Sequence, residues 1–201
     1  MQRGAAWGWS IRAHTPQELL IGLYLRDAAG LEPAEPHVPR VEPPLPVRVR
    51  LPGREAAAAQ WSRWWRSAVL GGPEVLAGVL PPAFPGLRGV PELHGVAELL
   101  VDEAVEWSVL QREREAALVR RLPTPLFEAN VVQDVQVRVG RRLPPVDVHI
   151  AHLPVRDPTW WGVAGGRFLV PLALRADRDA YLAWLRERLE EIAVTGALPA
   201  P

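Results

Sequence analysis

The chain of 201 residues contains no cysteine, which excludes disulfide bonds, thiolate nucleophiles and cysteine-bound metals. Lysine is absent as well, so all 23 positively charged side chains are arginines. Without lysine the chain cannot contain a Walker A loop or form the Schiff base of a pyridoxal-phosphate enzyme. Phe, Tyr and Met are also scarce. This bias is typical of a GC-rich genome, so we expect a protein of a bacterium or of its phage.

An excess of charge of one sign is missing too, since the formal net charge is zero. This balance disfavours a broad electropositive surface, and we therefore expect no nucleic-acid partner. No segment approaches the roughly 18 consecutive apolar residues of a membrane span. Residues 1–14 lack the apolar core of a signal peptide. We expect a cytoplasmic protein that does not bind membranes.

Hydrophobic residues make up 48% of the chain, enough for a sizeable core in a chain the length of one domain. We expect an N-terminal strand–helix unit over residues 1–30, a proline-rich connector over 31–46 and a main α+β domain over 47–201. These parts are expected to form one compact domain. The connector holds six prolines, some of them at the period of polyproline II. We expect this arm to dock on the chain itself or on a partner.

Two segments in the first third of the chain have the pattern of helices. Residues 16–29 are apolar on nearly every side, which predicts a buried helix. Thr15 is expected to cap its start and Gly30 to end it. Residues 55–70 carry three tryptophans on one helical stripe, which we expect in the core. These are Trp61, Trp64 and Trp65.

Two further helices are predicted in the second half of the chain. Residues 92–122 have apolar side chains at the period of 3.6 and predict one long helix. The last helix is expected to begin after Asp177, whose carboxylate can accept a backbone N–H of the first turn. The apolar stripe of this last helix consists of Tyr181, Trp184, Leu185, Leu189 and Ile192.

Alternating apolar and polar residues predict the strands. Residues 6–13 and 46–51 have the pattern of half-buried strands. Residues 131–139 and 146–151 alternate on either side of a short loop with Gly and Pro, and predict an antiparallel hairpin. Residues 168–175 are a further candidate strand. We therefore predict an α+β fold, with a mixed or mainly antiparallel sheet of four to five strands and helices packed on one face.

The stretch DPTWWGVAGGRF, residues 157–168, places two large apolar side chains in a predicted loop. Either both rings close the end of the core, or at least one stays at the surface as an anchor for a partner. Neighbouring side chains of an extended backbone point to opposite sides. We therefore expect Trp160 to pack against the sheet and Trp161 to contact a partner. The predicted binding residues are Trp160, Trp161 and Arg167.

The predicted hairpin would bring several polar side chains onto one face. Its register would put Arg138 opposite Asp147 and Gln136 opposite His149. An aspartate two residues from a histidine on a strand face can hold the imidazole as a general base. The simpler interpretation is a solvated face with an ordinary Arg–Asp pair. The candidate catalytic residues of an enzyme would be His149, Asp147, Asp134 and Asp157.

No motif predicts a metal or a cofactor. His94, Glu98 and Asp102 recur every four residues on the long predicted helix, and they are of metal-ligating types. However, no HExxH motif and no second acidic helix accompanies them. His149 and His152 point to opposite faces of a regular strand. We therefore expect a solvated helix face, no metal site and no cofactor.

The exclusions, the nine tryptophans and the proline-rich arm favour a non-enzymatic module for protein binding or assembly. It would bind through its Trp-bearing loops and the arm, and its partner would be another protein or a second copy of the chain. The alternative hypothesis is a small hydrolase or metal-assisted enzyme that uses the Asp/His cluster. A closed pocket beside His149 would favour the enzyme, whereas an exposed tryptophan on a flat surface would favour binding.

Overall fold

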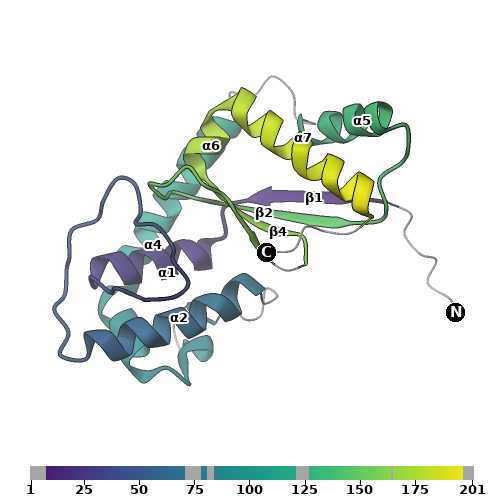
Figure 1. Ribbon diagram of the computed structural model, residues 1–201. Coiled ribbons are helices and arrows are strands. Elements are labelled where there is room, and N and C mark those ends of the chain that lie inside the picture. The colour runs from purple at the N-terminus through teal and green to yellow at the C-terminus, as the bar shows by residue number, and fades with distance from the viewer. Residues whose placement is uncertain (1–7, 71–77, 81–83, 121–126, 164, 197–201) are drawn as a thin grey trace, which may run out of the picture. The chain divides into compact units, whose positions relative to one another are not determined.

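The computed structural model describes residues 8–70, 78–80, 84–120, 127–163 and 165–196 (Figure 1). The described residues form six α-helices, one 3-10 helix and four strands in a mixed sheet, which confirms the predicted α+β class. By their internal contacts they divide into two compact units. Unit 1 contains Met1–His14, Ala117–His152 and Pro158–Pro201, and unit 2 contains Thr15–Ala116 and Leu153–Asp157.

The sheet of unit 1 has the strand order β1-β2-β4-β3. Strand β1, Ser10–His14, runs parallel to β2, Asp147–Leu153. Strands β3, Trp161–Val163, and β4, Arg167–Pro171, form an antiparallel pair. The predicted N-terminal strand is therefore confirmed as β1, with its bounds shifted along the chain; residues 6 and 7 lie outside the described residues.

One face of this sheet packs against the helices α5, Phe127–Val139, and α7, Arg178–Thr195. Figure 1 shows both helices on the same side of the sheet. Every second residue of the strands, such as Val148 and Ile150, belongs to the shared core, and the residues between them point to the opposite face. The helix residues of this core are Val131, Val132, Val135, Tyr181, Trp184, Leu185, Leu189, Ile192 and Ala193.

Helix α7 begins as predicted. The carboxylate of Asp177 accepts a hydrogen bond from the backbone N–H of Ala180 at 3.1 Å, which satisfies one of the N–H groups left open at a helix start. All five residues of the predicted stripe are buried. The predicted strand over 168–175 is wrong in its second half, because β4 ends at Pro171 and the short helix α6, Leu172–Ala176, follows.

The predicted antiparallel hairpin is wrong, because its first strand is the helix α5. Val131 and Val135 are four residues apart, a spacing that fits one face of a strand and also one face of a helix. The neighbouring valines decide between the two. Val132 is fully buried beside Val131, whereas Val137 is 77% exposed, as a period of 3.6 residues requires.

The glycine of the predicted hairpin turn ends α5 instead. Gly140 has φ 72°, and its N–H donates to the carbonyl of Gln136 at 3.0 Å. A glycine in this left-handed conformation is a common helix ending. The side-chain oxygen of Gln136 accepts the N–H of Leu143 at 3.1 Å and holds the loop that leads to β2.

Unit 2 contains the helices α1, Gln17–Ala28, and α2, Arg54–Leu70, and most of α4, Pro91–Arg120. Every residue of α1 from Leu19 to Ala28 is buried, as its all-round apolar pattern predicts. Gly30, at φ 61°, follows the end of α1. The predicted cap at Thr15 is wrong, because Pro16 is the N-cap and no side chain caps the helix.

The tryptophan stripe of α2 lies in the core of unit 2, as predicted. Trp61, Trp64 and Trp65 are at most 4% exposed. The rings of Trp61 and Trp65 stack with centroids 5.0 Å apart, and Trp61 Nε1 donates to the carbonyl of Gly22 at 2.7 Å. Helix α4 confirms the long predicted helix as far as Arg120, and residues 121 and 122 lie outside the described residues.

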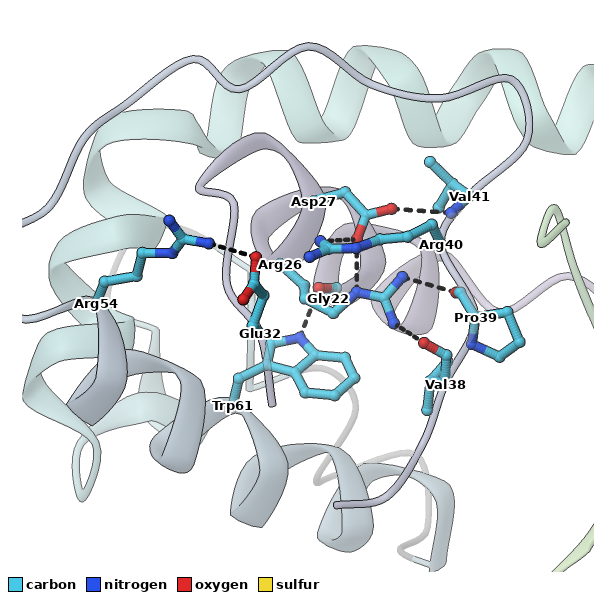
Figure 2. A network of polar contacts seen from close by, with 10 residues as sticks. All are labelled: Gly22, Arg26, Asp27, Glu32, Val38, Pro39, Arg40, Val41, Arg54 and Trp61. Atoms are coloured by element: carbon cyan, nitrogen blue, oxygen red, sulfur yellow. Dashed lines mark hydrogen bonds and ion pairs between the residues drawn. The ribbon is translucent and has the colours of Figure 1, made fainter. Parts of the chain in front are cut away.

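The proline-rich connector docks on α1 of its own unit (Figure 2). The guanidinium of Arg26, which is 1% exposed, donates to the carbonyls of Val38 and Pro39 at 2.6 and 2.8 Å. It also forms an ion pair with Asp27 at 2.5 Å and lies 5.2 Å from the ring centroid of Trp61. Arg26 therefore supplies hydrogen bonds that an extended proline-rich backbone cannot make with itself.

Asp27 holds the next residues of the connector. Its carboxylate accepts the backbone N–H of Val41 at 2.8 Å and the side chain of Arg40 at 3.0 Å. Val41 also forms an isolated bridge with Val155, a residue of the segment that returns from the sheet. The arm is thus attached to its own chain through a buried carboxylate, which agrees with one of the two predicted possibilities.

Residues 46–51, predicted as a strand, form none. The N–H groups of Arg48 and Val49 both donate to the carbonyl of Ala28, at 2.6 and 3.4 Å, so the end of α1 supplies the partner that a neighbouring strand would supply. Val47 is 59% exposed. In the part of the chain that the structure describes, no helix has the length and apolar character that crossing a membrane requires.

Candidate binding face of the sheet

The face of the sheet opposite α5 and α7 carries polar side chains from three strands of unit 1. On β1 they alternate with Ile11 and Ala13, on β2 with Val148 and Ile150, and on β4 they precede Phe168, all of which pack toward the helices. We name this set the polar face. It consists of Ser10, Arg12, His14, Asp147, His149 and Arg167.

Three of these residues form a row across neighbouring strands. Arg12 is the Cα partner of His149 in the ladder between β1 and β2. The N–H of His149 donates to the carbonyl of Gly166 at 2.9 Å, which brings the adjacent Arg167 next to the histidine. Arg167 in turn pairs with Val163 of β3. With a strand spacing of about 4.8 Å, the row of three residues extends over roughly 10 Å, and Val163 continues it to roughly 14 Å.

Positive charge dominates this face. Arg12 and His14 are exposed, whereas His149 and Arg167 are half-buried. The one carboxylate of the set belongs to Asp147, which is exposed and accepts a hydrogen bond from the hydroxyl of Ser10 on the neighbouring strand. Within this set, Arg12 and Arg167 carry permanent positive charges, and the carboxylate of Asp147 lies beside Ser10 at the start of the ladder between β1 and β2.

The imidazole of His149 responds to this charge distribution. Partial burial lowers its pKa below the ordinary value of 6.5, and the positive charges of Arg12, Arg167 and His14 lower it further, while Asp147 raises it. Arg12 and Arg167 each lower the pKa by more than Asp147 raises it, so the charges around His149 disfavour its protonated form. At neutral pH this side chain is an uncharged imidazole between two guanidinium groups.

The two tryptophans of the predicted loop are both half-buried, but they face opposite sides of the sheet. The ring of Trp160 lies 5.9 Å from Phe168 and 6.0 Å from Trp184, and the guanidinium of Arg188 lies 4.7 Å from it. Trp160 is thus an anchor on the core of unit 1. Trp161 is half-buried and opens the edge strand β3, opposite Leu169, on the side of the sheet that carries the polar face.

The structure brings together only part of the predicted catalytic set. Asp147 and His149 share the polar face, as the alternation of β2 predicts. Asp134 belongs to α5, and Asp157 belongs to unit 2. His152 is 1% exposed on the core side, with its ring 5.9 Å from that of Tyr181. The hydrolase hypothesis thus loses Asp134, and with it the predicted contributions of Gln136 and Arg138, because all three lie on a helix.

The partners of His149 that sequence reasoning missed lie on β1. Ser10, Arg12 and His14 occupy the polar positions of a strand whose alternation was visible in the sequence. The pairing of this strand with β2 could not be predicted, because Ser10 and Asp147 are 137 positions apart. Parallel strands are also not joined by a short turn that the sequence would reveal.

The described residues contain no cluster of three or more His, Asp or Glu side chains that could hold a metal ion. The row of His94, Glu98 and Asp102 lies on α4, with the two carboxylates exposed. The chain matches no known family of proteins, no characterised protein and no solved structure. The arguments for function therefore rest on the polar face and on the strands that form it.

Proposed function

We propose that this chain is a non-enzymatic protein-binding module, and that its recognition surface is the polar face together with Trp161 and Val163 of β3. The observation that carries the proposal is that the two neighbouring tryptophans face opposite sides of the sheet. Both rings are half-buried, but Trp160 packs on the core, whereas Trp161 lies on the side opposite the covering helices. A large aromatic ring beside arginines is a frequent source of binding energy in protein interfaces.

The proline-rich arm is already bound to its own chain, which supports placing the recognition surface on the sheet. Arg26 and Asp27 bind the backbone of the arm at Val38, Pro39 and Val41. Those backbone groups are therefore used within the chain, and recognition of a partner by the arm would first require their release. The sheet face needs no such rearrangement, because Arg12 and His14 are exposed where they stand.

The proposal is tested by affinity purification of the tagged chain from its native host, followed by mass spectrometry. We compare wild type with Trp161→Ala, and use Val137→Ala as the matched control, because Val137 is exposed on α5. A partner captured by wild type and by Val137→Ala, but lost with Trp161→Ala, supports the proposal. The melting temperature of each variant shows whether it is folded. Capture of the same proteins by all three chains contradicts the proposed surface.

A further inference from the structure

We propose that the partner presents an acidic segment, and that one of its carboxylates binds over His149 between Arg12 and Arg167. This inference rests on the proposed function and names the chemistry of the partner. In this arrangement an apolar side chain two residues from the carboxylate, on the same side of the extended segment, contacts Val163 and Trp161, which continue the row onto β3.

The row has the form that such a segment needs. Arg12, His149 and Arg167 come from three neighbouring strands and point to the same side. Guanidinium groups bind carboxylates through two parallel hydrogen bonds. Because strands keep their side chains at fixed positions, the sheet holds the two arginines on the strands β1 and β4, which flank His149 on β2.

The electrostatics favour an anion at this place. The positive charges of His14 and Arg12 on β1 and of Arg167 on β4 lower the pKa of His149, whereas the carboxylate of Asp147 on β2 raises it. A carboxylate placed over the row would oppose the two guanidinium charges and favour the protonated imidazole. Binding of an acidic segment is therefore expected to be coupled to proton uptake by His149, and to become tighter as the pH falls.

The occupant is a protein segment and not a nucleic acid for reasons of charge. A nucleic acid gains its affinity from many phosphate contacts along a continuous basic surface. Here the exposed Asp147 lies next to the row, and the net charge of the chain is zero. The positive area is limited to one row, which suits one or two carboxylates of an extended peptide.

The test measures fluorescence anisotropy of labelled probes at low salt. The probes are a short peptide in which Glu and Leu take turns at every second position with Ser between them, the same peptide with Gln in place of Glu, and a single-stranded oligothymidylate. The chains are wild type, Arg12→Glu, Arg12→Gln, His149→Gln and the matched control Arg178→Glu, since Arg178 is an exposed residue of α7. Circular dichroism of each variant establishes that it is folded.

We expect the Glu peptide to bind wild type and Arg178→Glu, and to bind about tenfold more weakly to Arg12→Glu. The affinity of wild type should rise as the pH falls from roughly 7 to 5, and this rise should be absent in His149→Gln. The Gln peptide should bind more weakly than the Glu peptide at every pH.

Three results overturn the inference. If the Glu and Gln peptides bind equally well, or if neither binds, the surface does not recognise a carboxylate. Tighter binding of the oligothymidylate, lost with Arg12→Glu, identifies a nucleic-acid surface instead. Self-association of wild type in sedimentation, lost with Arg12→Glu, identifies a second copy of the chain as the occupant. A partner lost with Trp161→Ala would still support the proposed function if the acidic peptide failed.

Discussion

At the scale of single residues, Gly22 decides how closely two helices of unit 2 approach. A Cβ atom built on Gly22 would lie 2.2 Å from Cζ3 of Trp64, inside the van der Waals distance, and the carbonyl of Gly22 accepts the indole N–H of Trp61. The helix α1 therefore tolerates the poor helix propensity of glycine because its surface at this position must be flat.

The substitution Gly22→Ala should lower the free energy of unfolding by roughly 1–3 kcal/mol, the usual cost of overpacking a core. The matched control is Gly95→Ala on α4, where a Cβ would meet nothing within 4 Å. That control should raise stability by about 0.5–1 kcal/mol through helix propensity. Urea unfolding measures both, and effects of the same sign would contradict the account of Gly22.

Asp27 should matter far more than an exposed carboxylate. Its side chain is 4% exposed and faces Arg26, which is 1% exposed, so Asp27→Ala leaves a buried positive charge without its counterion. The expected loss is roughly 3–5 kcal/mol. Glu32→Ala breaks the exposed ion pair with Arg54 and should cost at most about 1 kcal/mol. Similar melting temperatures for the two variants would show that the network is not buried in solution.

His149 should make the stability of the chain depend on pH. Its pKa in the folded state is lowered below 6.5, so below 6.5 the unfolded chain binds more protons at this residue than the folded chain does. The contribution is therefore present above 6.5 and is lost as the pH falls toward the folded pKa. Between about pH 7 and pH 5, wild type should lose more unfolding free energy than His149→Gln. A larger loss in the variant would contradict the lowered pKa.

At the scale of elements, the cap of α7 determines the start of the helix that covers the sheet. Asp177→Ala removes the hydrogen bond to the N–H of Ala180 and should lower the unfolding free energy by about 1 kcal/mol. Asp177→Asn, which keeps an oxygen acceptor, should restore most of it. Thermal unfolding of the three chains tests this, and an equal loss in both variants would assign the effect to charge instead of to the cap.

Helix α5 shows why a segment with a correct pattern of apolar and polar residues can still be predicted as a strand when it is a helix. Four valines at odd positions fit a strand, and valine favours strands by propensity. Packing against α7 and the sheet buries Val131, Val132 and Val135 together, which only a helical period allows. Burial against a neighbouring element therefore outweighs the local preference of the branched side chains.

At the scale of the whole molecule, charge balance should govern solubility. The chain has a formal net charge of zero and a sequence pI of about 7.0, so repulsion between molecules is weakest near neutrality. Light scattering of concentrated samples should be highest near pH 7 and fall on either side of it. Scattering that changes in one direction only across this range would show that local patches, and not net charge, control association.

Much of the fold followed from sequence because helix and strand periods, caps and glycine endings are local. The tryptophan stripe of α2, the cap at Asp177, the helix ending at Gly30 and the alternation of β2 all depend on residues a few positions apart. The opposite orientations of Trp160 and Trp161 follow from extended backbone geometry. The absence of lysine and cysteine excluded whole classes of chemistry without any reference to the fold.

The tertiary structure alone decided which elements are neighbours. The pairing of β1 with β2 joins residues 137 positions apart, and it places Arg12 beside His149 in the position that the predicted hairpin assigned to a residue of α5. The docking of the connector also depends on long-range packing, because it requires that the charged side chains of Arg26 and Asp27 are buried. The sequence shows only that these two residues are neighbours. Local patterns specify the surfaces of elements, whereas long-range packing selects the partner that each surface covers, and the polar face is a product of that selection.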